Sequence, residues 1–406
     1  MALTNSLIPT LYLTRTGLLE PLGQSQVMAY LRGLSRDYQV TLITYEKDRD
    51  WADTSRMEAA RRECESYGIH WLPQRFRFRP RIIAPTIDMI RMARLVAGSV
   101  KQKKIKLIHA RSYIPAAVAL FVKKTLGVPF IFDMRALWPE ELIAAGRLKR
   151  NSIMHWFIKR AERACLEKAA AVVSLTHSAV EHLKEIYPKT RGQRFSVIPT
   201  CADLDRFTPA DETPENRTFG CLGTVLSGWF RIDWLASFFN LASNKDPELS
   251  FELTTLDDPE KVRAALGPEL QKRVTIESSF PDQVQNILRR QIASVMFFTQ
   301  GLSKLGSSPT RMGEILGCGI PVVANDGVGD VAKIIKDYRV GVVIRKPEEM
   351  ANAWDELQLL LSEPDLATRC RNAAEDIFSL KAGTDSYRAL YTVILGNRGS
   401  VPPSNT

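Results

Sequence analysis

The chain has 406 residues, of which 45% are hydrophobic and 25% charged, which suits a folded protein of two domains and argues against extended disorder. No apolar run approaches the roughly 18 residues that cross a bilayer, and the start of the chain lacks the basic region of a secretory signal. We therefore expect a cytoplasmic protein. The six cysteines form no C-x-x-C pair, which argues against a zinc site and against a disulfide framework.

The net charge of +10 is concentrated in the first half of the chain. Residues 1–200 carry 33 Lys and Arg against 17 Asp and Glu, whereas the remainder carries 22 against 28. The densest basic clusters are 75–81, which is interleaved with aromatic residues, and 101–106. Such a surface suits an anionic membrane or a nucleic acid, or it is a solvated face without a partner. Because the sequence shows no nucleic-acid module, we expect an anionic membrane surface and no nucleic acid.

In the first half of the chain, apolar strands alternate with helices. Strands are predicted at 10–14, 39–44, 69–72, 106–110, 129–133 and 171–175, and helices at 24–35, 52–67, 86–100, 152–169 and 178–187. This repeated alternation predicts an α/β domain with a doubly wound sheet.

Polar groups stand at the ends of two of these strands. His109 lies at the end of one strand, and Asp133 and Arg135 lie at the end of the next. Because an open α/β sheet binds its ligands at the carboxyl ends of its strands, these three residues are candidate catalytic groups. Asp133 could accept a hydroxyl proton, and Arg135 could pair with a phosphate or an acidic group. The alternatives are a packed histidine and a structural Asp–Arg pair, and it stays open whether His109 or Arg111 of the same strand is the functional residue.

The second half of the chain repeats the alternation. Strands are predicted at 219–222, 249–254, 273–278, 293–298, 320–324 and 340–345, and helices at 282–289, 347–361, 364–378 and 379–395. Gly223 follows the first of these strands and suits close approach of a phosphate, with Arg231 as the nearby cation. Asp203 and Asp205 have the spacing of an Asp-x-Asp metal motif, but their neighbours fit a linker better, so we expect no metal.

The segment 303–330 reads as a loop, a helix and a buried strand. Ser308 stands where an N-cap is expected, and Pro309 stands at the first helical position. The free N–H groups and the positive dipole end of such a helix suit a phosphate or a diphosphate.

Three side chains of the predicted helix add to this site. Thr310 contributes a hydroxyl and Arg311 a charge, while Glu314, one turn further along, could reach the sugar hydroxyls of a nucleotide. The alternative is a capped amphipathic helix on which Arg311 and Glu314 form a surface pair.

The run Ser307-Ser308-Pro309-Thr310-Arg311-x-Gly313-Glu314, followed by Cys318-Gly319-Ile320-Pro321-Val322-Val323, resembles the donor-binding signature of glycosyltransferase family 4. These are nucleotide-sugar-dependent enzymes of the GT-B fold, and the likeness is to the bacterial surface-polysaccharide type. The resemblance implies that Glu314 holds the donor ribose and that the preceding loop and helix start hold the diphosphate. The glutamate that the family carries eight positions earlier is Gly306 here, so its sugar contacts would come from Lys304 or from backbone groups.

The resemblance runs from about residue 14 to residue 395. It implies two doubly wound Rossmann-like domains that face each other across a cleft. An acceptor-side domain would span 1–205, a nucleotide-sugar-binding domain would span 216–378, and a closing helix at 379–398 would pack back on the first domain.

The implied activity is retaining transfer of a sugar from a nucleotide diphosphate donor to a glycan or lipid-linked acceptor. The implied setting is cell-surface polysaccharide synthesis, peripheral on the inner face of the plasma membrane. A helix dipole and cations would stabilise the leaving group, so we expect neither a metal nor a cofactor.

The resemblance also assigns the expected site residues. The donor-binding residues are Glu314, Ser308, Thr310, Arg311, Arg231, Gly223 and Lys304, and the catalytic residues on the acceptor side are His109, Asp133 and Arg135. In the first loop it adds Glu20 and Gln24 as cleft residues, with plain turn chemistry as the alternative.

Two other functions remain open. A nucleotide-sugar epimerase of the GT-B fold would use the same donor pocket but would need acid and base carboxylates close to the sugar. A non-catalytic subunit that binds a glycan or a membrane is favoured by the glycine at position 306.

Overall fold

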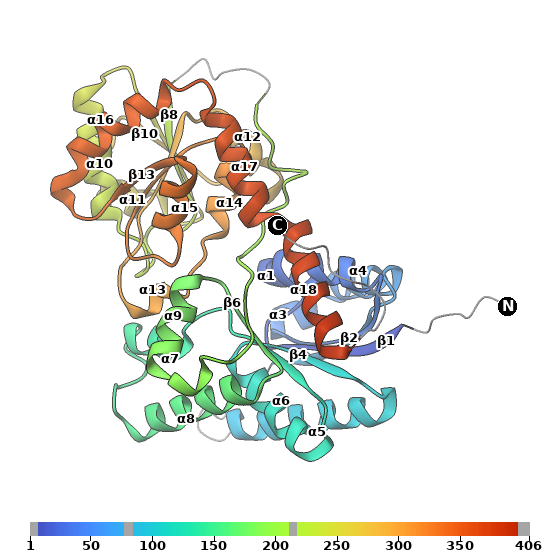
Figure 1. Ribbon diagram of the computed structural model, residues 1–406. Helices are drawn as coiled ribbons and strands as arrows, with labels where there is room; N and C mark the ends of the chain where they lie inside the picture. The colour runs from blue at the N-terminus through green and yellow to red at the C-terminus, as the bar shows by residue number, and fades with distance from the viewer. Residues whose placement is uncertain (1–6, 77–83, 211–216, 397–406) are drawn as a thin grey trace. The chain divides into compact units, whose positions relative to one another are not determined.

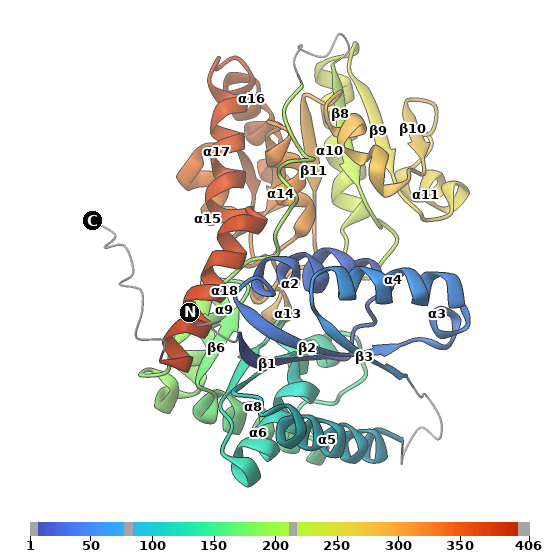
Figure 2. The same cartoon turned by 90° about the vertical axis from the view of Figure 1, so that its right-hand side faces the viewer.

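The structure is a computed structural model that describes residues 7–76, 84–210 and 217–396 (Figures 1 and 2). Its internal contacts divide the chain into two compact units. The first consists of Met1–Leu175, Ala179–Ile198 and Gly383–Thr406, and the second of Thr176–Ser178 and Pro199–Ala382. The chain therefore passes into the second unit before the expected boundary at residue 205, and most of the expected closing helix belongs to the first unit.

The first unit is built on a seven-stranded parallel sheet of order β3-β2-β1-β4-β5-β6-β7. Its strands are β1 (Ile8–Thr14), β2 (Tyr38–Glu46), β3 (His70–Arg75), β4 (Leu107–Arg111), β5 (Phe130–Asp133), β6 (Ala171–Ser174) and β7 (Phe195–Val197). Each of the six strands predicted in this half is present, which confirms the doubly wound sheet.

Helices cover both faces of this sheet. They are α1 (Pro21–Gly23), a π-helix at Gln24–Met28, α2 (Ala29–Leu34), α3 (Asp48–Ala52), α4 (Thr54–Ser66), α5 (Ala84–Lys103), α6 (Tyr113–Leu126), α7 (Trp138–Ala144), α8 (Ile153–Lys168), α9 (His177–Ile186) and the C-terminal α18 (Leu380–Leu395). Figures 1 and 2 show α2 and α4 on one face of the sheet and α5, α6 and α8 on the other.

Helix α6 is an element that the periodicity does not predict. Its sequence is a nearly continuous apolar run, and Ala116, Val118, Ala119 and Val122 are almost fully buried. The helix lies against α5, α8 and the sheet, so it is covered on several sides. A helix buried in this way lacks the amphipathic period by which surface helices are detected.

The second unit is built on a six-stranded parallel sheet of order β10-β9-β8-β11-β12-β13. Its strands are β8 (Thr218–Leu222), β9 (Ser250–Thr254), β10 (Val274–Glu277), β11 (Ala293–Met296), β12 (Val322–Asn325) and β13 (Gly341–Ile344). Its helices are α10 (Ile232–Lys245), α11 (Pro259–Leu266), α12 (Val284–Leu288), α13 (Leu302–Leu305), α14 (Thr310–Gly317), α15 (Val331–Tyr338), α16 (Met350–Leu361) and α17 (Leu366–Phe378).

The central strands are apolar because both of their faces are covered. In β5, β11 and β12 every residue is buried, as expected for parallel strands between two helical layers. The six cysteines are buried and form no disulfide. Among the helices of the described residues, none is both long enough and apolar enough to cross a membrane.

Two glycines let α14 pack closely within the second unit. A Cβ added to Gly313 would lie 2.7 Å from Cβ of Phe378, at the end of α17. A Cβ added to Gly317 would lie 2.8 Å from Cδ2 of Leu204. Both distances are shorter than real Cβ contacts, so the glycine within the 307–314 motif has a packing role.

We predict that Gly313→Ala destabilises the second unit. Alanine is favoured over glycine by about 1 kcal/mol within a helix, whereas overpacking typically costs about 1–3 kcal/mol, so we expect a net loss. Urea unfolding would measure it. Gly228→Ala is the matched control, because nothing lies within 4 Å of a Cβ at that position. A Gly313→Ala protein more stable than wild type would show that α14 is not tightly packed.

Candidate functional site

The second sheet has a topological switch point between β8 and β11, where the strand order reverses. In open α/β sheets, ligands bind at the carboxyl ends of the two strands that flank such a point. Arg311 of α14 lies between these ends. Its guanidinium is 5.3 Å from the ring centre of Phe298, which follows β11. On the other side it meets Gly223, which follows β8: a Cβ there would lie 2.4 Å from Nη2 of Arg311.

Gly223 is therefore required for the position of Arg311. Its φ of +99° lies in the region that favours glycine, and its missing side chain leaves the room that the guanidinium fills. The sequence assigned Gly223 to a phosphate, but its contact in the structure is with the cation that would hold one.

Arg311 forms no ion pair in the described part of the chain, and its buried Nη1 has no hydrogen-bond partner there. Burial lowers the pKa of Arg311, and Glu314 opposes that effect only in part. Because a buried charge without a partner is costly, this guanidinium suits an anionic ligand.

Glu314 lies one turn further along α14. Burial raises the pKa of its carboxyl group, and Arg311 and Arg206 oppose the shift. Within the described residues, no ion pair joins Glu314 to Arg311, and both are partly buried. The alternative of an exposed Arg311–Glu314 surface pair is therefore wrong. A perturbed carboxyl beside an uncompensated cation is typical of functional sites.

The start of α14 differs from the prediction by one residue. Pro309, with φ −68° and ψ 116°, is the N-cap residue, and the helix begins at Thr310. Ser308 does not cap the helix, because its backbone oxygen and hydroxyl face Thr200. Thr200 Oγ1 donates to Ser308 O at 2.7 Å, and Thr200 N donates to Ser308 Oγ at 3.4 Å. The backbone N–H groups of Thr310 and Arg311 have no hydrogen bond to the described residues, so they can bind an anion.

The two other expected cations have aromatic or acidic neighbours. Lys304 of α13 is nearly buried, and its Nζ lies 4.0 Å from the ring centre of Trp229. Arg231 Nη2 lies 2.6 Å from Oδ2 of Asp233, and this pairing raises the pKa of Arg231. Arg231 would have to leave Asp233 before it could serve a ligand, which makes it the weaker of the predicted donor residues.

In the first unit, the expected catalytic residues form one enclosed cluster. His109 Nε2 lies 3.3 Å from Oδ2 of Asp133, and Tyr387 of α18 donates to the same oxygen at 3.2 Å. Arg135 Nη1 lies 3.6 Å from Oδ1 of Asp133 and donates to the hydroxyl of Tyr387 at 3.3 Å. The hydroxyl of Tyr391 lies 2.8 Å from Nδ1 of His109.

The burial of this cluster argues against direct catalysis. His109 and Asp133 are each only 1% exposed. Tyr391 and Tyr387 of α18 contact them and help to shield them from solvent. Burial lowers the pKa of His109, which keeps the ring neutral. Burial alone would raise the pKa of Asp133, but Arg135 and His109 outweigh it and lower that pKa. This geometry favours the alternatives of a packed histidine and a structural Asp–Arg pair, and the catalytic assignment of His109, Asp133 and Arg135 stays a prediction.

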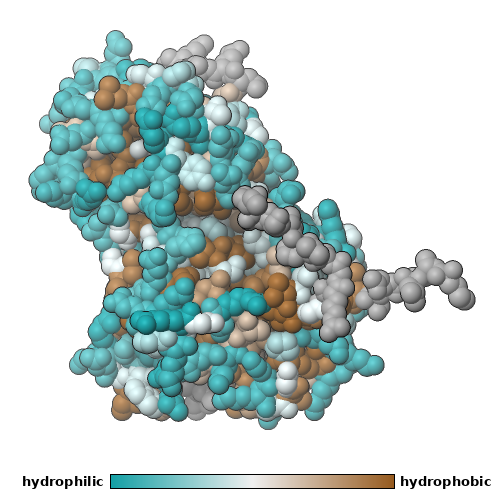
Figure 3. Space-filling model, in the orientation of Figure 1, coloured by the Kyte–Doolittle hydropathy of each residue, from teal (hydrophilic) through white to brown (hydrophobic). Residues whose placement is uncertain are grey.

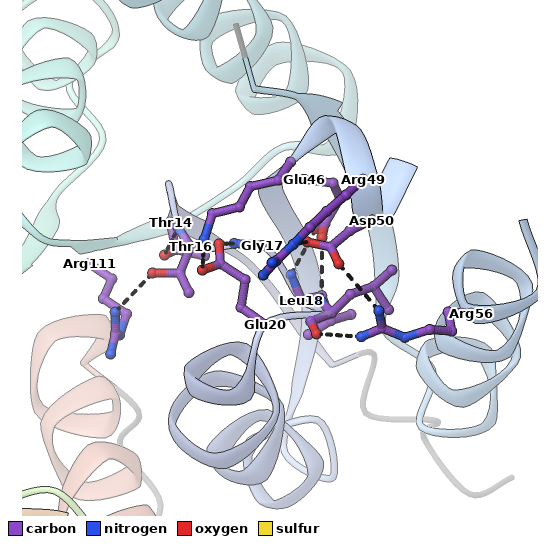
Figure 4. Close-up of polar contacts among 12 residues, drawn as sticks. Thr14, Thr16, Gly17, Leu18, Glu20, Glu46, Arg49, Asp50, Arg56 and Arg111 are labelled. Atoms are coloured by element: carbon purple, nitrogen blue, oxygen red, sulfur yellow. Dashed lines mark hydrogen bonds and ion pairs between the residues drawn. The ribbon is translucent and has the colours of Figure 1, made fainter. Parts of the chain in front are cut away.

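Arg111 lies at this sheet edge on the same strand as His109, and the sequence left open which of the two is functional. It ends β4, and its Nη1 donates to Oγ1 of Thr16, just beyond β1, at 3.3 Å (Figure 4). Strands β1 and β4 flank the switch point of the first sheet. Arg111 is 7% exposed, its Nε has no hydrogen-bond partner, and it forms no ion pair with any described residue. Side chains two apart on a strand share a face, so His109 and Arg111 lie on the same side of the sheet, and Arg111 is the one without a carboxylate partner among the described residues.

Two acidic residues hold the first loop, Glu46 from the end of β2 and Glu20 from the loop itself, as Figure 4 shows. Glu46 accepts hydrogen bonds from the backbone N–H groups of Leu18 and Leu19, at 2.8 and 3.3 Å. Glu20 accepts from Gly17 N at 3.0 Å and pairs with Lys47 at 2.6 Å.

The two residues that were expected in the cleft therefore have local partners. Glu20 is engaged as described above, and Gln24 Nε2 donates to Leu18 O at 3.0 Å. The turn-chemistry alternative describes both. Gly23 is tightly enclosed as well, since a Cβ there would lie 2.1 Å from the backbone oxygen of Gly17.

Solved structures share this architecture over nearly the whole chain. A glycosyltransferase from Rickettsia africae is 16% identical with a TM-score of 0.69, covering 97% of this chain and 100% of that one. The HepE protein of Anabaena in complex with UDP-glucose is 14% identical with a TM-score of 0.62, covering 95% and 100%. WaaG, a glycosyltransferase involved in lipopolysaccharide biosynthesis, is 16% identical with a TM-score of 0.63, covering 97% and 100%. The fold is thus the GT-B fold of two Rossmann-like units.

Family models identify the chain more closely. A glycosyl transferase 4-like domain matches residues 23–201, and the model for glycosyl transferases group 1 matches residues 257–377. The chain is therefore an enzyme of the group 1 glycosyltransferases, which favours a transferase over the epimerase and the non-catalytic subunit. Comparison with curated proteins gave no match. Among the described residues, no group of three or more His, Cys, Asp or Glu side chains is placed to hold a metal ion.

We predict that Asp133→Ala destabilises the first unit. The substitution leaves Arg135 buried without its carboxylate, which typically costs about 3–5 kcal/mol. Urea unfolding would measure the loss. The control is Asp37→Ala, which removes the exposed ion pair between Asp37 and Arg388 of α18 and should cost at most about 1 kcal/mol. Equal effects of the two substitutions would contradict the structural role of Asp133.

A second prediction concerns pH. Because burial lowers the folded-state pKa of His109, its contribution to stability is complete above the unfolded-state pKa of about 6.5 and is lost as pH falls below it. The free energy of unfolding of the wild type should therefore fall between pH 7 and pH 5.5. In His109→Gln that fall should be smaller. Parallel pH profiles for the two proteins would show that His109 does not titrate as the geometry requires.

Proposed function

We propose that this glycosyltransferase binds a nucleotide diphosphate sugar at the start of α14 in its second unit. The observation that carries the proposal is the partly buried guanidinium of Arg311 at the switch point, which forms no ion pair with the described residues. A diphosphate would supply that counter-charge and accept from the N–H groups of Thr310 and Arg311. Glu314, one turn further along, is placed to accept from the ribose hydroxyls.

Three other residues that were expected to bind the donor would support this site. Lys304 adds a cation from α13, Gly223 allows Arg311 its position, and Ser308 fixes the loop through Thr200. A UDP sugar is the favoured donor, since the Anabaena protein of the same fold was solved with UDP-glucose.

In the proposed reaction, the bond between the anomeric carbon and the diphosphate breaks and a bond to an acceptor hydroxyl oxygen forms, with retention. The proton of that hydroxyl passes to a phosphate oxygen of the leaving nucleoside diphosphate. The nucleoside diphosphate leaves with a negative charge that Arg311 and the helix dipole stabilise, so no metal is needed for that step. His109, Asp133 and Arg135 act here as positioning residues that hold α18 on the sheet. Arg111 becomes the acceptor-side candidate.

A glycan or lipid-linked acceptor remains our proposal, as does a role in cell-surface polysaccharide synthesis on the inner face of the plasma membrane. WaaG, of the same fold, acts in lipopolysaccharide biosynthesis, which supports this choice. The excess of basic residues in the first half of the chain suits such an anionic surface.

We predict that Glu314→Ala and Arg311→Met each weaken UDP binding at least tenfold, a loss of about 1.4 kcal/mol or more. Calorimetric titration with UDP, GDP and ADP would measure the affinities and identify the base. Arg231→Met is the matched control: it removes an arginine of the same unit that is already paired with Asp233, so we expect a smaller change.

Two results would contradict the proposed function. If none of the nucleoside diphosphates binds the wild type, the donor site is wrong. If UDP binds but Glu314→Ala leaves its affinity unchanged, the nucleotide lies elsewhere in the protein.

A further inference from the structure

The first turn of α8 exposes four large apolar side chains to solvent. Ile153 is 79% exposed, Met154 62%, Trp156 56% and Phe157 57%. They belong to one helical turn, and the rings of Trp156 and Phe157 touch edge to face at 5.0 Å. Figure 3 shows apolar side chains at the lower left of the visible face, where Figure 1 draws α8. A cluster of this kind on a protein surface marks an interaction site.

The exposed turn is fixed by the opposite face of the helix. Glu162 accepts hydrogen bonds from the hydroxyls of Tyr113 and Tyr187, at 2.9 and 2.6 Å, and Leu166 is fully buried. Ser152 caps the helix start by accepting from the backbone N–H of His155 at 3.2 Å. The apolar side chains are thus held outward by a well-anchored helix.

Exposed cations surround these side chains. Arg147 and Lys149 lie in the turn before α8, and Arg160 stacks on Trp156 with its guanidinium 5.5 Å from the ring centre. In the part of the chain that the structure describes, none of the three forms an ion pair. Their charge is therefore available to an anionic partner.

We propose that the first turn of α8 inserts into the interface of an anionic lipid bilayer. Ile153, Met154 and Phe157 would enter the boundary between headgroups and acyl chains, and Trp156 would lie at headgroup level, where tryptophan is enriched. The cations would contact lipid phosphates, which attract juxtamembrane basic residues.

Area favours a membrane over a second protein. A whole aromatic side chain buries roughly 150–250 Å², so four partly exposed side chains fall short of the about 800 Å² per partner of a standard protein interface. Shallow insertion into lipid needs no such area.

This surface differs from the basic clusters expected from the sequence. Residues 77–81 of the first cluster lie outside the described residues, and the cluster at 101–106 lies at and beyond the end of α5. The inference is independent of the donor site, because α8 belongs to the first unit.

The test is sedimentation of the full chain with vesicles of pure phosphatidylcholine, and with vesicles that also contain 30% phosphatidylglycerol. We expect the wild type to bind the anionic vesicles and to release as salt rises. Trp156→Ser with Phe157→Ser should weaken binding at least tenfold. Arg147→Gln with Lys149→Gln should weaken it roughly tenfold to thirtyfold and reduce the salt dependence.

The matched control is Leu256→Ser with Leu359→Ser, which removes two apolar side chains of the second unit that are more exposed than Trp156 and Phe157, and it should leave vesicle binding unchanged. Vesicles that contain brominated lipid should quench the tryptophan fluorescence of the wild type more strongly than that of Trp156→Phe, because Trp156 would lie near the bromine atoms. UDP affinity should be the same in all these proteins, which separates this test from that of the donor site.

Three outcomes would overturn the inference. One is a wild type that ignores anionic vesicles, and another is an α8 double variant that binds them as well as the wild type. The third is a wild-type dimer that the α8 substitutions dissociate in sedimentation velocity without any effect on lipid binding.

Discussion

A guanidinium enclosed in a protein needs a counter-charge, and the two units of this chain meet that need differently. In the first unit, Arg135 faces the carboxylate of Asp133, whose other oxygen is taken by His109 and Tyr387. The charges of that cluster are paired, and it holds α18. In the second unit, Arg311 forms no ion pair with the described residues, and its Nη1 has no hydrogen-bond partner among them. Because an isolated buried charge is costly, the second arrangement is the one that suits a ligand.

Topology explains where these groups are found. Each sheet reverses its strand order once, between β1 and β4 in the first unit and between β8 and β11 in the second. Arg111 and Arg311 stand at these two points, each with a side-chain nitrogen that has no hydrogen-bond partner among the described residues. Two doubly wound units therefore present one cation each where such sheets bind ligands. Because Arg111 occupies the position in the first sheet that Arg311 occupies in the second, we favour Arg111 as the acceptor-side residue.

The sequence predicted the parts of the site that depend on local spacing. Arg311 and Glu314 share one helix, so their proximity follows from helical geometry, and the strands follow from their apolar runs. The enclosure of Asp133 could not be predicted in this way, because Tyr387 lies 254 positions away and only the return of α18 brings it near. The same holds for Gly223, whose contact with Arg311 is set by the packing of α14 against the sheet.

The predictions of helix boundaries and of exposed helix faces failed for a different reason. Ser308 has the composition of an N-cap, but its hydroxyl faces Thr200, a partner far away in the sequence. Helix α8 was predicted within a residue or so of its ends, yet apolar periodicity does not separate a face that packs inside from one that faces outward. In α8 both exist: Leu166 is buried, whereas Ile153 and Phe157 are exposed.

The glycine at position 306 bears on how the donor would be recognised. Between Leu302 and Gly317 the cations Lys304 and Arg311 stand against one carboxylate, that of Glu314. A second glutamate at 306 would balance these charges, whereas glycine leaves an excess of positive charge that an anion can neutralise. The missing carboxylate also removes an acceptor for sugar hydroxyls. Recognition should therefore depend more on the diphosphate than on the sugar, so a free nucleoside diphosphate would bind nearly as well as the donor itself.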